Sequence, residues 1–117
     1  MTLDINEKET GSALVIKLEG ELDSSSVSEF ASKLQEITLK KTSGKYVVDM
    51  SRLEFISSAG WTLFVKECKS LRLQGGDMCF AAMLQNAERI YSLVGIDTFI
   101  KSYPTVDMAV KSFEGKG

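Results

Sequence analysis

The chain begins with two short stretches in which apolar and polar residues alternate. Residues 3–9 alternate in their first half, residues 13–18 read Ala-Leu-Val-Ile-Lys-Leu, and Thr10 and Gly11 stand between the two stretches. Alternation with a period of two indicates β-strands, and a glycine between two such stretches favours a turn. These residues therefore predict an N-terminal β-hairpin.

Two longer segments have helical periodicity. The first apolar stripe comprises Val27, Phe30, Ala31, Leu34 and Ile37, and the second comprises Trp61, Phe64, Val65, Cys68 and Leu71. The spacing i, i+3, i+4, i+7, i+10 places each set on one face of an α-helix. Ser26 and Glu29 have the spacing of a capping box at the first helix, with residues 23–25 as other caps. Gly75-Gly76 is expected to end the second helix.

The rest of the chain completes an alternating order of helices and strands. Two short apolar segments, residues 45–50 and 78–83, are typical of central strands. After them, the pattern predicts a third helix over residues 86–94, an edge strand over residues 99–103 and a last helix over residues 105–113. This order predicts an α/β sandwich, in which a mixed sheet of about five strands carries about four helices. We expect one domain over residues 1–117, with residues 114–117 as a flexible tail.

Charge and hydropathy narrow the classes of partner. Fourteen basic and sixteen acidic side chains give a net charge of −2, so no basic surplus is available to neutralise a nucleic-acid backbone. No apolar run approaches the roughly 20 residues that span a bilayer. The first residues are acidic, unlike a signal peptide. We therefore expect a cytoplasmic protein without nucleic-acid binding or membrane insertion.

The absence of histidine from the sequence excludes most catalytic chemistry. It removes Ser-His and Cys-His nucleophile pairs, histidine metal ligands and the usual general base near neutral pH. Cys68 and Cys79 lie in apolar segments, where cysteine usually behaves as a small buried hydrophobic residue. We therefore expect a non-enzymatic protein without cofactor or metal.

The most informative segment is Ser57-Ser58-Ala59-Gly60, which follows an apolar strand and begins the second helix. The first amides of a helix lack intrahelical partners and the macrodipole is positive there. A serine at this place is either a simple N-cap or an anion-accepting site, and the same physics serves both. Phosphorylation of Ser58 would add about −1.5 to −2 charges, which these amides could receive.

Three motifs, in this order and spacing, resemble the STAS domain of the anti-sigma-factor antagonist family. They are Gly20-Glu21-Leu22-Asp23, Val48-Asp49-Met50-Ser51 with Phe55-Ile56, and Ser57-Ser58-Ala59-Gly60. The resemblance implies that an anti-sigma factor with serine kinase activity binds the unphosphorylated protein and that phosphorylation at Ser58 releases it. It also implies a phosphatase that resets the protein, and a partner-facing end formed by Asp23 and residues 57–61.

Two positions depart from the family pattern. Ser57 stands where the family usually has Asp, so Ser57 is a second candidate phosphoacceptor. Trp61-Thr62 replaces the usual Leu-Gly, and Trp61 is either a core residue or, if exposed, a partner-binding hot spot. Asp23 is either a helix cap or a partner contact.

The alternative function is a constitutive, non-phosphorylated STAS subunit of a signalling scaffold or a lipid-transport complex. The sequence leaves the oligomeric state open.

Overall fold

The computed structural model describes residues 3–40 and 44–114. Its elements are β1 (Leu3–Thr10), β2 (Ala13–Leu22), α1 (Val27–Leu39), β3 (Lys45–Ile56), α2 (Ser58–Leu73), β4 (Asp77–Ala81), α3 (Gln85–Leu93), the 3-10 helix η1 (Ile96–Thr98), β5 (Ser102–Tyr103) and α4 (Val106–Glu114). The predicted order of strands and helices is confirmed. Residues 115–117 of the predicted tail lie outside the described residues, and Glu114 is the last residue of α4.

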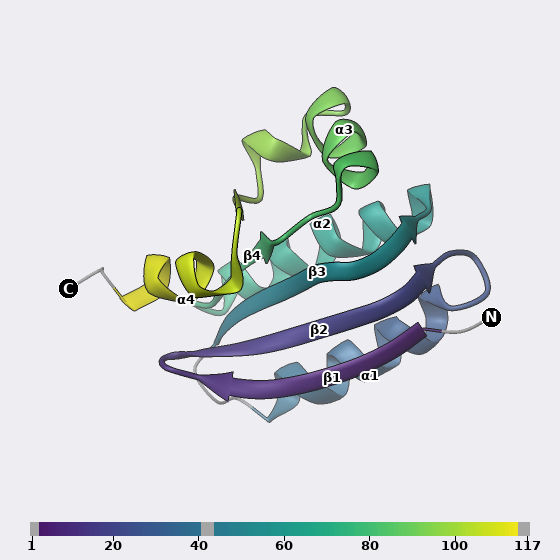
Figure 1. Cartoon of the computed structure of the whole chain (residues 1–117). Helices are drawn as coiled ribbons and strands as arrows, with labels where there is room; N and C mark the ends of the chain where they lie inside the picture. Colours follow the sequence, from purple (N-terminus) through teal and green to yellow (C-terminus); the bar gives the residue numbers. More distant parts are fainter. Residues whose placement is uncertain (1–2, 41–43, 115–117) are drawn as a thin grey trace.

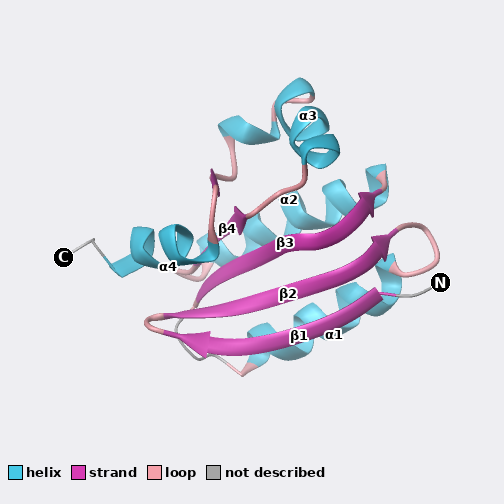
Figure 2. Cartoon of the chain, viewed as in Figure 1, coloured by secondary structure: helices cyan, strands magenta, loops and turns pink. Residues whose placement is uncertain are grey.

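The strands form one mixed sheet in the order β1-β2-β3-β4-β5 (Figures 1 and 2). β1 and β2 pair antiparallel as the predicted hairpin, and the other neighbours pair parallel. Parallel neighbours need crossover connections, and the helices between the strands supply them. The predicted α/β sandwich of about five strands and four helices is therefore correct.

Strand ends are where the sequence prediction was least accurate. β2 and β3 continue to Leu22 and Ile56, beyond the predicted ends at residues 18 and 50, because they stay paired through two register shifts. Conversely, β4 ends at Ala81, since Ala82 has a positive φ of 56° that ordinary strand geometry does not allow. The predicted strand over residues 99–103 shrinks to two residues, after the 3-10 turn η1.

The two faces of the sheet carry separate apolar layers. On one face, α1, α2 and α3 pack over the larger cluster, where the rings of Phe30 in α1 and Phe64 in α2 meet edge to face with centroids 5.6 Å apart. On the other face, Ala109 and Val110 of α4 pack on the smaller cluster, which includes Cys79. Cys68 and Cys79 are both buried and free, as expected from their apolar segments.

Candidate functional site

The start of α2 lies where β2 and β3 end side by side. Leu22 pairs with Ile56 at the last position of these parallel strands, and the amide of Ser57 donates to the Leu22 carbonyl over 2.8 Å. Gly60 is buried against the same strand ends: a Cβ placed there would lie 3.0 Å from Ile56 Cγ2 and from Leu22 Cδ2. Glycine at this position therefore allows the first turn of α2 to approach the sheet closely.

Ser57 is the N-cap of α2. Its backbone is extended, with φ −80° and ψ 170°, and its Oγ accepts a hydrogen bond from the amide of Gly60 over 3.2 Å. The Ser57 carbonyl accepts from the amide of Trp61 over 3.0 Å. The hydroxyl of Ser57 therefore already satisfies one of the amides that a helix start leaves unpaired.

Ser58 is the first residue of α2 and points its side chain into solvent. Within the part of the chain that the structure describes, its hydroxyl has no hydrogen-bond partner, and neither do the amides of Ser58 and Ala59. The first turn of α2 carries no acidic residue. The positive end of this helix is thus exposed and uncompensated, an arrangement that favours an anion at Ser58.

Asp23 follows the end of β2 and organises the loop before α1. Its Oδ1 accepts from the Ser25 amide over 2.9 Å and from the Ser25 hydroxyl over 2.7 Å. These bonds, the hydroxyl bond first, hold the pKa of the Asp23 carboxyl below its ordinary value. The residue before Asp23 is Leu22, whose carbonyl accepts the hydrogen bond from the Ser57 amide. Asp23 and the start of α2 therefore lie at the same end of the sheet.

The predicted capping box at α1 is wrong. Ser26 occupies the N-cap position, but its hydroxyl donates to the Glu21 carbonyl over 2.8 Å and accepts from the Asp23 amide over 3.1 Å. Its backbone is already helical, with φ −112° and ψ −9°, and no side chain caps α1. The Asp23 carboxylate likewise closes its own turn, while the Asp23 carbonyl accepts from the amides of Ser26 and Val27.

Trp61 is a core residue, only 6% exposed. Its ring contacts those of Phe64, Phe80 and Tyr91, with centroids 6.3, 5.9 and 6.3 Å apart. Aromatic groups of this kind are worth about 0.5–1.5 kcal/mol per pair beyond their burial. Of the two roles expected for Trp61, the structure therefore shows the packing role directly.

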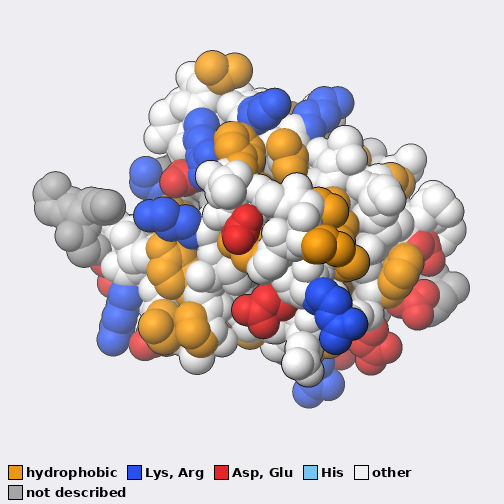
Figure 3. Space-filling view, turned by 90° about the horizontal axis from the view of Figure 1, so that it is seen from above, with side chains coloured by type: hydrophobic (Ala, Val, Ile, Leu, Met, Phe, Trp, Pro, Cys, Tyr) orange, Lys and Arg blue, Asp and Glu red, His pale blue; other side chains and the backbone are white. Residues whose placement is uncertain are grey.

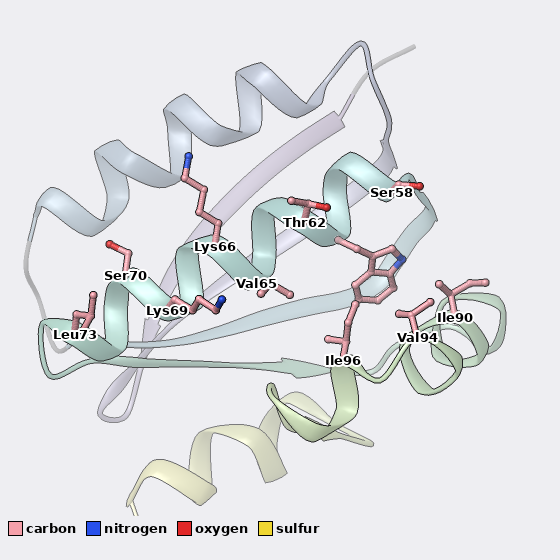
Figure 4. A pocket seen from close by; sticks show the side chains of 11 residues that line it. Ser58, Thr62, Val65, Lys66, Lys69, Ser70, Leu73, Ile90, Val94 and Ile96 are labelled. Carbon is pink, nitrogen blue, oxygen red and sulfur yellow. The ribbon is translucent and has the colours of Figure 1, made fainter.

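A groove beside Ser58 was missed by the sequence reasoning. It has a volume of about 750 Å³ and runs along the outer face of α2 toward α3 (Figure 4). Apart from Ser58 and Trp61, its lining residues are Thr62, Val65, Lys66, Lys69, Ser70, Leu73, Ile90, Val94 and Ile96. The sequence signal for this groove was a set of apolar residues that do not belong to the buried helical stripes. They are Leu73 in α2, Ile90 in α3 and Val94 directly after α3.

Among residues 3–40 and 44–114, no group of three or more cysteine, aspartate or glutamate side chains is arranged to hold a metal ion. In the same residues, no helix has the length and apolar character required to cross a bilayer.

Comparison with known proteins identifies the family. Residues 4–109 match the STAS domain, so the chain belongs to the STAS domain family. A Mycobacterium tuberculosis protein assigned as an anti-anti-sigma factor is 27% identical over 117 residues, which are 99% of this chain and 76% of that protein. The match therefore extends over nearly the whole chain.

Two solved structures share the fold. The crystal structure of an anti-sigma factor antagonist from Thermotoga maritima superimposes with a TM-score of 0.87 at 23% identity, covering 94% of each chain. The phosphorylated form of the Bacillus cell fate determinant SpoIIAA has a TM-score of 0.71 at 19% identity, covering 94% of this chain and 99% of that one. The family match over residues 4–109 confirms the predicted STAS resemblance.

Proposed function

We propose that this protein is an anti-sigma-factor antagonist of the cytoplasm. In its unphosphorylated form it binds a cognate anti-sigma factor that is also a serine kinase, and this binding frees a sigma factor for transcription. Phosphorylation at Ser58 releases the antagonist, and a phosphatase returns it to the binding form. The protein itself is not an enzyme. Support comes from the STAS family match over residues 4–109 and from the name of the mycobacterial relative.

The different surroundings of the Ser57 and Ser58 hydroxyls support Ser58 as the phosphoacceptor. The Ser58 hydroxyl is exposed and unpartnered within the described part of the chain, whereas the Ser57 hydroxyl is half-buried and accepts from Gly60. A phosphate on Ser57 would have to replace the cap bond, while one on Ser58 would meet the open helix end without breaking any bond. This difference favours Ser58 over Ser57.

The rest of the proposed partner surface comprises Asp23, Ser57, Ala59, Gly60 and Trp61. Asp23 and Ala59 are accessible at the strand-end edge. Gly60 and Trp61 are buried, so they support this surface by positioning α2. A phosphate at the end of the sheet that also carries the Asp23 carboxylate would make this end strongly anionic and disfavour binding of any partner surface that is acidic or apolar.

Incubation with the cognate anti-sigma factor kinase and ATP tests this function. Mass spectrometry should locate phosphate on Ser58, Ser58→Ala should abolish labelling, and Ser57→Ala should retain it as the matched control. Ser58→Asp should weaken binding to the anti-sigma factor by about tenfold or more, since like charges across an interface oppose association. Labelling that persists in Ser58→Ala and disappears in Ser57→Ala would assign the acceptor to Ser57 instead.

A second function is favoured by the serine at position 57, where the family usually has a carboxylate. In this alternative the chain is a constitutive STAS subunit of a signalling scaffold or a lipid-transport complex and is never phosphorylated. Purification from the native cell separates the two. A scaffold or transporter partner with unmodified Ser57 and Ser58 would support the alternative, and an anti-sigma factor partner with phosphoserine would exclude it.

A further inference from the structure

The groove along α2 exposes apolar side chains that the fold leaves uncovered. Leu73 is 89% exposed, Val94 60% and Ile90 40%, and all three line the same groove. On the face seen in Figure 3, apolar side chains likewise reach the surface, among Lys, Arg, Asp and Glu. Single exposed apolar residues are ordinary, but several lining one groove indicate a surface that another molecule covers.

The charge of the groove indicates the kind of molecule. Its charged lining residues are Lys66 and Lys69, and no carboxylate among the described residues lines it. This cationic site stands out on a chain whose net charge is −2. In Figure 4, Lys66 extends toward the side of α1, whereas Lys69 lies on the other side of α2, with its Nζ 6.0 Å from the centroid of the Phe99 ring. Ile90 and Val94 lie on the side of α3. An occupant therefore needs an apolar face toward α3 and carboxylates that can reach the lysines on either side of α2.

The shape of the groove favours a helix over a small ligand. The lining runs from Ser58 at one end of α2 to Leu73 at the other (Figure 4). These 16 residues span about 24 Å at the helical rise, the length of a helix of about four turns. Small ligands are held in concave pockets that bury most of their surface. A shallow groove open along its length suits the apolar stripe of an amphipathic helix.

We infer that the groove is a docking site for an acidic amphipathic helix, about four turns long, supplied by a protein partner. Its apolar stripe would cover Leu73, Ile90 and Val94, and its carboxylates would face Lys66 and Lys69. Ser58 lies at the end of the groove. A phosphate there would place negative charge against the acidic helix, and this coupling rests on the function proposed above.

The test uses the full chain and a display library of random 15-residue peptides. Selection for binding to the wild-type chain should enrich peptides that combine acidic residues with apolar residues at i, i+4 and i+7. The enriched peptides should quench the fluorescence of Trp61, the only tryptophan of the chain and a groove residue. Their affinity should fall as the salt concentration rises, because ionic attraction is screened.

Leu73→Glu and Leu93→Glu form a matched pair. Each leucine is the last residue of its helix and is highly exposed, at 89% and 78%, but only Leu73 lines the groove. We expect Leu73→Glu to weaken the selected peptides by about tenfold or more, and Leu93→Glu to leave their affinity within about twofold.

A second pair of variants tests the charge. Reversal of both groove lysines in Lys66→Glu/Lys69→Glu should cause a loss of about tenfold, whereas Lys8→Glu/Lys101→Glu, at exposed positions outside the groove, should have little effect. Enrichment of basic peptides, or equal binding by both double variants, would overturn the inference. So would concentration-dependent dimerisation that Leu73→Glu abolishes, because the occupant would then be a second copy of this chain.

The effect of Ser58 is tested separately. Ser58→Asp should bind the selected acidic peptide more weakly than Ser58→Ala, and equal binding would refute the coupling. If the kinase labels neither Ser58 nor Ser57 while the Leu73→Glu effect is present, the proposed function is refuted and the docking site stands. If Ser58 is labelled and no groove-dependent peptide is enriched, the docking site is refuted and the proposed function stands.

Discussion

Ser57 and Ser58 are neighbours in the sequence, but only the Ser57 hydroxyl caps α2. Alanine substitutions at the two positions should therefore change the free energy of unfolding by different amounts. Ser57→Ala removes the acceptor that the Gly60 amide uses at 3.2 Å. Loss of an N-cap serine costs about 1 kcal/mol, within a range of roughly 0.5–2. Ser58→Ala removes a hydroxyl that has no partner among the described residues, so the free energy of unfolding should change by less than about 0.5 kcal/mol.

The expected shift in melting temperature follows from the size of the chain. An unfolding entropy of about 2.1 cal/mol/K per residue near 60 °C gives about 0.25 kcal/mol/K for this chain, which has 117 residues. A loss of about 1 kcal/mol therefore lowers the midpoint by about 4 °C. Thermal unfolding followed by circular dichroism resolves such a shift, and urea unfolding gives the free energy independently.

Ser57→Asp provides the control for the physical cause. Aspartate is as good an N-cap as serine, and its charge also interacts favourably with the positive end of the helix. We therefore expect Ser57→Asp to be at least as stable as the wild type. The reasoning is refuted if Ser58→Ala destabilises the protein as much as Ser57→Ala, or if Ser57→Asp is as unstable as Ser57→Ala, because the cap would then not be Ser57.

Three further predictions concern other parts of the fold. Ser25→Ala should raise the pKa of the Asp23 carboxyl, which carboxyl NMR measures. In the folded wild type this pKa lies below the ordinary value of 3.8, so the stabilisation by Asp23 is present above pH 3.8 and is lost as the pH falls through the folded-state pKa. Gly76→Ala should destabilise the protein by about 1–3 kcal/mol in urea unfolding, because its Cβ would lie 2.4 Å from the backbone oxygen of Gly44; unchanged stability would contradict this contact. Burial raises the pKa of Cys79 from 9.0 to about 12, so at pH 8 it carries roughly a thousandfold less thiolate than an ordinary cysteine and should react with a thiol reagent only on unfolding; rapid labelling of the native protein would refute its burial.

Most of the fold could be predicted because periodicity is local. The stripe from Phe30 to Ile37 and the stripe from Trp61 to Leu71 each define a buried helical face, and burial of both is what the structure shows. Strand ends were less predictable. The continuation of β3 to Ile56 depends on pairing with β2, which belongs to a distant part of the chain.

The cap assignments needed tertiary information. Ser26 has the sequence spacing of a capping residue, yet its hydroxyl donates to the carbonyl of Glu21, a residue of β2, and does not cap α1. At α2 the sequence offered two adjacent serines without distinguishing them. The bond from the Ser57 amide to the Leu22 carbonyl sets the register of the helix start, and this register leaves the Ser58 side chain in solvent.

The sequence by itself determined the α/β class, the absence of histidine chemistry and the segment that carries the proposed switch, since these follow from composition and short-range pattern. The tertiary structure decided which serine caps the helix and created the groove. Leu73 and Ile90 come from different helices, and only the packing of α3 beside α2 brings them to one surface. A local pattern cannot report this, because the groove is a property of two elements and not of either alone.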